Sequence, residues 1–211
     1  MAINAPAPRA TLEIDYPDRP LNRLTSALRV FMIIPIAIVL AAVEGSTFTA
    51  QHAGDTYNIA LDGTGLLVLP PLLMLVFRRK YPRWWFDFNR ELVRFSARVA
   101  AYAALLTDHY PATDEEQEVH LQLPEPDAAS LNRWLPLVKW LLAIPHYIVL
   151  AFLYLGVVIA VVIAWFAILF TGRYPRSLFD FIVGVGRWHL RVVAYGFVLV
   201  TDEYPPFRLA P

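Results

Sequence analysis

The sequence contains no cysteine, which excludes disulfide bonds, thiolate metal sites and cysteine nucleophiles. Charged residues are also scarce: they make up 17% of the chain, against roughly 25% in typical soluble domains, and apolar residues make up 57%. The net charge is zero, so nothing indicates a nucleic-acid partner. No glycine-rich phosphate loop and no Gly-x-Ser-x-Gly elbow is present. These absences favour an integral membrane protein that is not an enzyme and that uses neither a cofactor nor a metal.

Long apolar runs account for this composition. Residues 24–43 are interrupted only by Arg29, which lies near one end of the run, where a long side chain can snorkel to the headgroups. Residues 64–77 form a shorter run. Residues 140–172 contain no Asp, Glu, Lys or Arg, and as one helix they would be about 50 Å long, too long for an upright crossing. We therefore predict two short crossings there with a turn at Gly156; a re-entrant hairpin is the alternative.

Basic residues lie on one side of the predicted hairpins. The loop at residues 44–63 contains three acidic residues and no basic one. The second helix of each pair is instead followed by a basic group, comprising Arg78, Arg79, Lys80 and Arg83 in the first pair and Arg173 and Arg176 in the second. The positive-inside rule therefore predicts that both termini are cytoplasmic.

Two blocks of sequence occur twice in the same order, which indicates an internal duplication. The early block joins Asn-Arg to an Ile-Pro and begins at Leu21 and Leu131. The late block joins Tyr-Pro-Arg, Phe-Asp-Phe and Thr-Asp-x-Tyr-Pro and begins at Tyr81 and Tyr174. The offsets of 110 and 93 residues place 17 extra residues of the first copy at the tip of its hairpin, where an insertion is tolerated.

The predicted fold is an all-α membrane protein of two tandem repeats, each with a short strand, a transmembrane helical hairpin and an amphipathic interfacial helix, giving four short membrane helices in all. The first repeat covers residues 1–111, with hairpin helices at about 24–43 and 64–80 and an interfacial helix at about 82–106. After an acidic linker at 112–118, the second repeat covers 119–211, with hairpin helices at about 133–153 and 157–172 and an interfacial helix at about 175–200. Alternating residues at 12–16 and 119–123 are the predicted strands, which can pair with each other. The pseudo-two-fold axis should run along the membrane normal.

Each predicted interfacial helix has a basic face and an aromatic-aliphatic face. The predicted lipid or partner contacts are Arg83, Asp87, Arg94, Arg98, Arg176, Asp180, Arg187 and Arg191. The tryptophans Trp84, Trp85 and Trp188 are predicted interfacial anchors at headgroup depth. The two aspartates can instead pair with arginines. His146 lies inside a predicted membrane helix, but no second ligand has metal-like spacing, so a neutral hydrogen-bonded histidine is favoured over a haem or metal ligand.

These motifs, together with the segment from Trp165 to Pro175, resemble a bacterial membrane-protein family known as domain of unknown function 4389. The resemblance covers nearly the whole chain, and the second copy matches best. The first copy departs from it, with Phe-Arg-Arg-Lys at residues 77–80 in place of Phe-Thr-Gly-Arg. The resemblance implies a multi-pass protein of the bacterial cytoplasmic (inner) membrane and implies no particular activity.

The leading functional hypothesis is a non-catalytic membrane scaffold or accessory subunit. It would bind anionic membrane lipid, a membrane protein partner, or both, through its cytoplasmic amphipathic helices. The alternative is a lipid-handling enzyme or carrier, in which Asp87, Asp180, Arg94 and Arg187 line a headgroup cleft between the repeats.

Overall fold

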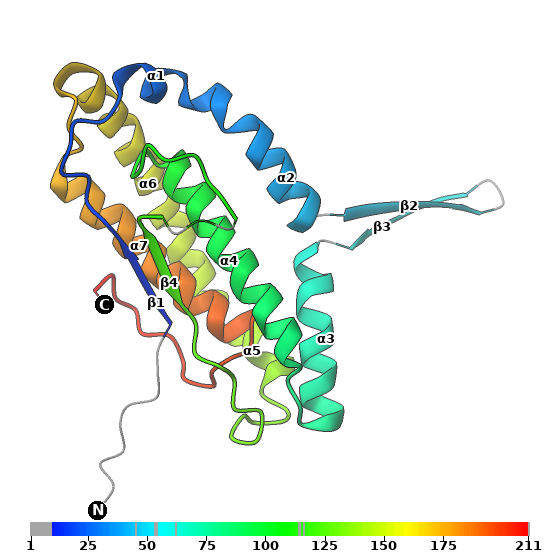
Figure 1. The fold of residues 1–211 in the computed structure, drawn as a ribbon. Coiled ribbons are helices and arrows are strands. Elements are labelled where there is room, and N and C mark those ends of the chain that lie inside the picture. Colours follow the sequence, from blue (N-terminus) through cyan, green and yellow to red (C-terminus); the bar gives the residue numbers. More distant parts are fainter. Residues whose placement is uncertain are drawn as a thin grey trace, which may run out of the picture.

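The structure, a computed structural model, describes residues 10–44, 46–52, 55–61, 63–113, 115 and 117–210. Within these residues the chain forms seven helices and two separate pairs of strands (Figure 1). The first half contains β1 (Thr11–Ile14), α1 (Arg23–Met32), α2 (Ile34–Glu44), β2 (Ser46–His52), β3 (Asp55–Leu61), α3 (Gly63–Arg78) and α4 (Arg83–Ala103). The second half contains β4 (Val119–Gln122), α5 (Pro136–Leu142), α6 (Ile144–Thr171) and α7 (Arg176–Gly196). The predicted helical class is confirmed.

The two amphipathic helices, α4 and α7, form the middle of the molecule. On one side β1 packs on α7 and β4 packs on α4, and on the other side α6 packs on α7 and α2 on α4. The two helices run antiparallel (Figure 1), because the start of each lies against the end of the other. The Tyr81 hydroxyl donates to the Val198 carbonyl over 2.8 Å, and the Tyr174 hydroxyl donates to the Ala104 carbonyl over 3.1 Å.

The predicted strands pair with each other, as expected. β1 and β4 are antiparallel, with Leu12 opposite Leu121 and Glu13 opposite His120. The two leucines are buried, whereas Glu13 and His120 are exposed, so the period of two separates a core face from a water face. A two-stranded ribbon is marginal alone, and here it rests on α4 and α7.

The apolar helices α2 and α6 each follow a break in the helix, and each has a proline near its start. α1 and α2 are bent by 40° at Ile33, and α5 and α6 break at the corresponding Ala143. Pro35 and Pro145 follow two residues later, where a missing backbone N–H removes one helical hydrogen bond. The side chain of Asn22 caps α1 by accepting from the backbone N–H groups of the two residues Leu24 and Thr25.

The turn predicted at Gly156 is wrong, and so is the re-entrant alternative. α6 continues through this position as one helix of 28 residues, so the predicted helices at 133–153 and 157–172 are not a hairpin. Gly156 serves close packing instead: a Cβ atom there would stand 3.3 Å from the ring of Phe181 on α7. A helix of this length spans about 42 Å and fits a bilayer only when tilted or lying along it.

Among the described residues, α6 is the one helix long and apolar enough to cross a membrane, and the bent pair α1–α2 makes a second if it counts as one span. Only 17% of the most apolar window of α6 is buried, unlike the core helix of a soluble protein. The apolar part of α3 is shorter, from Leu67 to Arg78.

Candidate functional site: an apolar face, two buried ion pairs and a cavity

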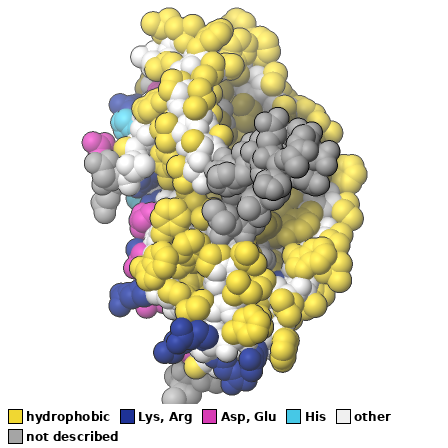
Figure 2. All heavy atoms as spheres, turned by 90° about the vertical axis from the view of Figure 1, so that its right-hand side faces the viewer, with side chains coloured by type: hydrophobic (Ala, Val, Ile, Leu, Met, Phe, Trp, Pro, Cys, Tyr) yellow, Lys and Arg dark blue, Asp and Glu magenta, His cyan; other side chains and the backbone are white. Residues whose placement is uncertain are grey.

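One face of the molecule is covered by hydrophobic side chains. Figure 2 shows this face from the right-hand side of Figure 1, with basic side chains at its lower edge. Large exposed hydrophobic residues come from α1, α2, α3, α5 and α6, and they include Phe31, Ile38, Leu69, Phe77, Trp140, Phe152, Leu155, Phe166 and Phe170. Exposed apolar surface of this extent marks a membrane or partner interface. We call the surface of these five helices the apolar face.

The ribbon side of the molecule is polar. Glu13, Asp15 and His120 are exposed there, and the last two form a contact of 3.1 Å. The outward part of α4 carries Arg90 and Glu91, which form an ion pair of 3.1 Å. The ribbon side therefore differs from the apolar face in carrying exposed charged side chains.

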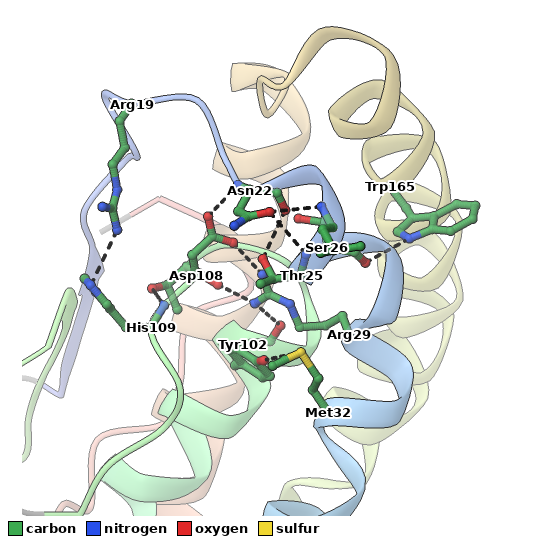
Figure 3. A network of polar contacts seen from close by, with 12 residues as sticks. Arg19, Asn22, Thr25, Ser26, Arg29, Met32, Tyr102, Asp108, His109 and Trp165 are labelled. Carbon is green, nitrogen blue, oxygen red and sulfur yellow. Dashed lines mark hydrogen bonds and ion pairs between the residues drawn. The ribbon is translucent and has the colours of Figure 1, made fainter.

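Arg29 of α1 forms a buried cluster with the segment that follows α4 (Figure 3). Its side chain is 3% exposed, and its Nη2 lies 2.5 Å from Oδ1 of Asp108. Its Nη1 donates to the carbonyls of Thr107 and Tyr102 over 2.5 and 3.2 Å. The guanidinium also lies 4.0 Å from the centre of the Tyr102 ring. The prediction that Arg29 snorkels to headgroups is wrong, because this partner set satisfies the charge inside the protein.

Lys139 of α5 forms the same kind of cluster with the segment that follows α7. Its side chain is fully buried, and its Nζ lies 2.7 Å from Oδ1 of Asp202. The ammonium donates to the Thr201 carbonyl over 2.8 Å and lies 5.1 Å from the centre of the Tyr195 ring. These residues match the Arg29 cluster position by position along the two halves.

Each aspartate also binds the start of the apolar helix. Oδ2 of Asp108 accepts the backbone N–H of Asn22 over 2.9 Å, and Oδ2 of Asp202 accepts that of Asn132 over 2.6 Å. A buried charge is tolerated when it is paired and hydrogen-bonded. Both clusters therefore fasten an apolar helix to the amphipathic layer.

Two of the predicted lipid contacts, Arg94 and Arg187, tie the halves together. Arg94 of α4 donates to the Leu121 carbonyl in β4 over 3.4 Å, and Arg187 of α7 donates to the Leu12 carbonyl in β1 over 2.9 Å. Each arginine thus holds the strand that belongs to the other half.

Arg98 and Arg191, one turn further along their helices, hold extended segments. Arg98 donates to the Ala112 carbonyl over 2.6 Å. Arg191 donates to the Ala210 carbonyl over 3.2 Å and also to the Arg208 carbonyl. Four predicted contact residues thus have backbone partners within the protein.

The other predicted contacts lie at the surface. Arg83 is exposed and reaches Glu125 over 3.3 Å. Asp87 pairs with Arg90 over 3.2 Å, and Asp180 pairs with Arg176 over 3.5 Å, so each aspartate has an arginine partner on its own helix. Arg83 and Arg176, at the starts of α4 and α7, are the most exposed arginines among the predicted contacts that form ion pairs.

The predicted tryptophan anchors occupy three different environments. Trp84 is 68% exposed, and Trp85 is half-buried and donates to the Leu67 carbonyl over 3.1 Å. Trp188 is only 6% exposed, so the anchor prediction is corrected there: its indole N–H is used inside the protein, donating to Nδ1 of His146 over 3.0 Å. The predicted hydrogen-bonded state of His146 is confirmed, and its ring also stacks on Phe207 with centroids 4.1 Å apart.

Glu118 at the end of the acidic linker is partly buried. Its Oε2 accepts the Thr107 hydroxyl over 3.1 Å, and its Oε1 contacts Nδ1 of His109. Burial by itself raises the pKa of the Glu118 carboxyl, but hydrogen bonds from its own backbone N–H, His109 and Thr107 outweigh it. The net pKa therefore lies below its ordinary value.

A cavity of about 570 Å³ lies between α4 and α7. Outer walls come from α3 and α6, through residues such as Leu67 and Tyr154, and the paired Leu12 and Leu121 of the ribbon also line it. Among the described residues, the lining is mostly aliphatic and contains four polar side chains, those of Asn89, Ser96, Tyr154 and His189. Burial lowers the pKa of His189, so this side chain is neutral at pH 7. The volume is in the range of small-molecule sites.

The comparisons with known proteins found one family model that matches part of the chain. Residues 134–208 match the sequence model of a family described as a domain of unknown function (DUF4389). The matched segment contains α5, α6 and α7, so the resemblance expected over nearly the whole chain is confirmed for residues 134–208. No curated protein and no solved structure matches the chain.

The role of Asp108 and Asp202 was not among the predictions from the sequence. Both aspartates belong to Thr-Asp-x-Tyr-Pro motifs, and they are the partners of the cations Arg29 and Lys139. The sequence signal that could have predicted these ion pairs is the recurrence of opposite charges at matched positions. No sequence pattern predicted the cavity, because it depends on how α4 and α7 pair.

Proposed function

We propose that this protein is a non-catalytic membrane scaffold or accessory subunit, embedded through its apolar face and binding anionic lipid, a membrane protein partner, or both, at the edge of that face. The observation that carries the proposal is the apolar face, together with the exposed Arg83 and Arg176 at the starts of α4 and α7. The alternative with a headgroup cleft has less support, because Arg94 and Arg187 bind the ribbon and both aspartates have arginine partners.

The two halves are proposed to be tandem repeats related by a pseudo-two-fold axis. The matched ion pairs and the reciprocal arginine contacts with the ribbon support this. The ends of α3 and α6 also correspond: Arg79 and Gly172 both have left-handed backbone conformations, with φ of 51° and 73°. The β2–β3 hairpin then represents the insertion in the first copy, splitting an apolar helix that is continuous as α6 in the second.

The proposed orientation takes account of the antiparallel pairing of α4 and α7. Arg83 and Arg176 begin these helices of 21 residues each, so they lie at opposite ends of a pair about 32 Å long. If α4 and α7 stood upright, the two basic ends would face opposite sides of the membrane, against the positive-inside rule. We propose that they lie along the cytoplasmic surface of a bacterial inner membrane, with the ribbon and both termini in the cytoplasm. A multi-pass arrangement with upright helices is the competing topology.

Cysteine labelling separates these topologies, and the chain has no native cysteine to remove. Arg83→Cys and Arg176→Cys are treated in intact cells and in inverted membrane vesicles with a maleimide that does not cross membranes. We expect both to be protected in cells and labelled in inverted vesicles. Labelling of one variant in cells and the other in vesicles would refute the surface arrangement. Phe152→Cys, at a position 74% exposed on α6, serves as the membrane-facing control and should resist the reagent in both preparations.

Lipid preference is tested by flotation of the purified protein with vesicles of phosphatidylcholine, with or without phosphatidylglycerol. The proposal predicts stronger association with the anionic vesicles and weaker salt-sensitive association after Arg83→Ala with Arg176→Ala. Equal association with both vesicles, without a co-purifying protein, would contradict a lipid- or partner-binding role.

A further inference from the structure

The cavity between α4 and α7 has a mostly apolar lining with a few polar groups. Its described lining contains no Lys, Arg, Asp or Glu, so an ionised ligand group would lie there without a counter-ion. Tyr154 and His189 add a hydroxyl and a neutral imidazole, and their rings meet edge to face at 5.9 Å. Such a lining fits an uncharged chain that has one weakly polar end.

Small side chains on α4 create the space. Ala97, Ala100 and Ala104 line the cavity, and the matched positions of α7 carry the larger Leu190, Val193 and Phe197. Ala100 is exposed although it lies on the helix side that lines the cavity, so its methyl group faces open volume. Protein interiors are normally packed to crystal-like density, and a void loses dispersion contacts along its walls. An occupant would restore them.

The cavity adjoins the apolar face. Leu67 and Val68 of α3 line it, and the next residue, Leu69, is an exposed residue of that face. On α6, Tyr154 and Val157 line it, and the neighbouring Leu155 and Val158 are exposed. A hydrocarbon chain already in the membrane can therefore reach the cavity between α3 and α6 without crossing water.

We propose that this cavity binds one hydrocarbon chain of a membrane phospholipid, with its ester region beside Tyr154 and His189 and its headgroup outside. The inference rests on the proposed membrane embedding. A fatty-acid carboxylate is disfavoured, because the described residues that line the space include no cation.

The test uses the full-length protein in phosphatidylcholine nanodiscs that contain a small fraction of phosphatidylcholine with a diazirine in one acyl chain. After illumination, proteolysis and mass spectrometry locate the adducts. We expect adducts within residues 97–104 and 186–193 as well as on the outward surface of α6. Ala100→Phe, which fills the cavity, should reduce the cavity adducts at least tenfold and leave the outer adducts unchanged.

Ala103→Phe is the matched control, since Ala103 is exposed on the same helix and does not line the cavity. It should label as the wild type does. Ala97→Leu, which introduces the residue of the matched α7 position, is the second filling variant if Ala100→Phe does not fold.

The other outcomes overturn the proposal in distinguishable ways. Adducts on the outer surface alone would refute the chain site and leave membrane embedding intact. No adduct anywhere would refute both. Cavity labelling by a diazirine fatty acid but not by the phospholipid, or a crosslinked pair of chains at the cavity, would show a free fatty acid or a second copy as the occupant.

Discussion

Replacing Asp108 by Asn removes the counter-ion of Arg29 and keeps the size of the side chain. The new amide oxygen can still accept the backbone N–H of Asn22, which Asp108 accepts over 2.9 Å. The guanidinium, 3% exposed, keeps its two carbonyl acceptors and the Tyr102 ring but loses its neutralising charge at 2.5 Å. The amide nitrogen then faces the guanidinium and cannot accept from it, so the substitution removes the charge and one hydrogen bond of Arg29 together.

The expected cost of this substitution is large for a single change. Breaking a buried ion pair by removing one partner costs about 3–5 kcal/mol. We expect about 3 kcal/mol, the lower end, because the Asp108 side chain is 14% exposed and the carbonyl contacts of Arg29 remain. In a chain of 211 residues this corresponds to a fall in melting temperature of about 6–12 °C.

The assay is unfolding in mixed micelles, followed by tryptophan fluorescence, for the wild type and for a double-mutant cycle. Arg29→Met and Asp108→Asn are measured singly and together. We expect a coupling free energy of about 2 kcal/mol, because the second substitution costs little once the first charge is gone. Asp202→Asn is the matched variant in the second half and should behave similarly, since Lys139 is fully buried.

A loss below about 0.5 kcal/mol for Asp108→Asn, with no coupling to Arg29→Met, would refute the reasoning, because it would place the pair among ion pairs of no energetic consequence. A large loss without coupling would show that the loss does not come from the charge contact between Asp108 and Arg29.

Three further predictions concern backbone strain, acid stability and the core. Gly172→Ala should destabilise the protein by about 1 kcal/mol and Arg79→Gly should stabilise it by a similar amount, because both positions have positive φ; thermal unfolding of the two variants checks the opposite signs. Glu118 has a lowered pKa, so the stability that its carboxylate contributes is present above the ordinary pKa of 4.5 and is lost as the pH falls below that value. The difference in unfolding free energy between wild type and Glu118→Gln should therefore shrink from about pH 5 to about pH 3. A difference that does not depend on pH would contradict this prediction. Trp188→Phe should cost about 1–3 kcal/mol in unfolding titrations, because it leaves the buried Nδ1 of His146 without a donor; a neutral effect would show that this hydrogen bond is dispensable.

Local features of the sequence predicted local structure well. The helices expected at about 82–106 and 175–200 are α4 at Arg83–Ala103 and α7 at Arg176–Gly196, because a proline at the start and a periodic apolar face act within one helix. The alternating segments predicted the strands, and their matching patterns predicted the pairing. Composition indicated the apolar class, and the recurrence of Asn-Arg and Thr-Asp predicted which positions correspond.

Other features depended on contacts between residues far apart in the sequence. A glycine in an apolar run is equally compatible with a turn and with close packing against another helix. Gly156 is a close packing position because Phe181 of α7 lies against it. Likewise, an arginine near a helix end can reach lipid headgroups or a carboxylate in the protein. Arg29 binds a carboxylate because Asp108, 79 residues away in the sequence, lies next to it in the fold. The alanines of α4 become a cavity only because α7 runs antiparallel beside them. Composition and periodicity are properties of neighbouring residues, so the sequence alone determined the helices and the apolar character, whereas only the tertiary structure decided which charges were neutralised inside, which tryptophan was buried and where space remained.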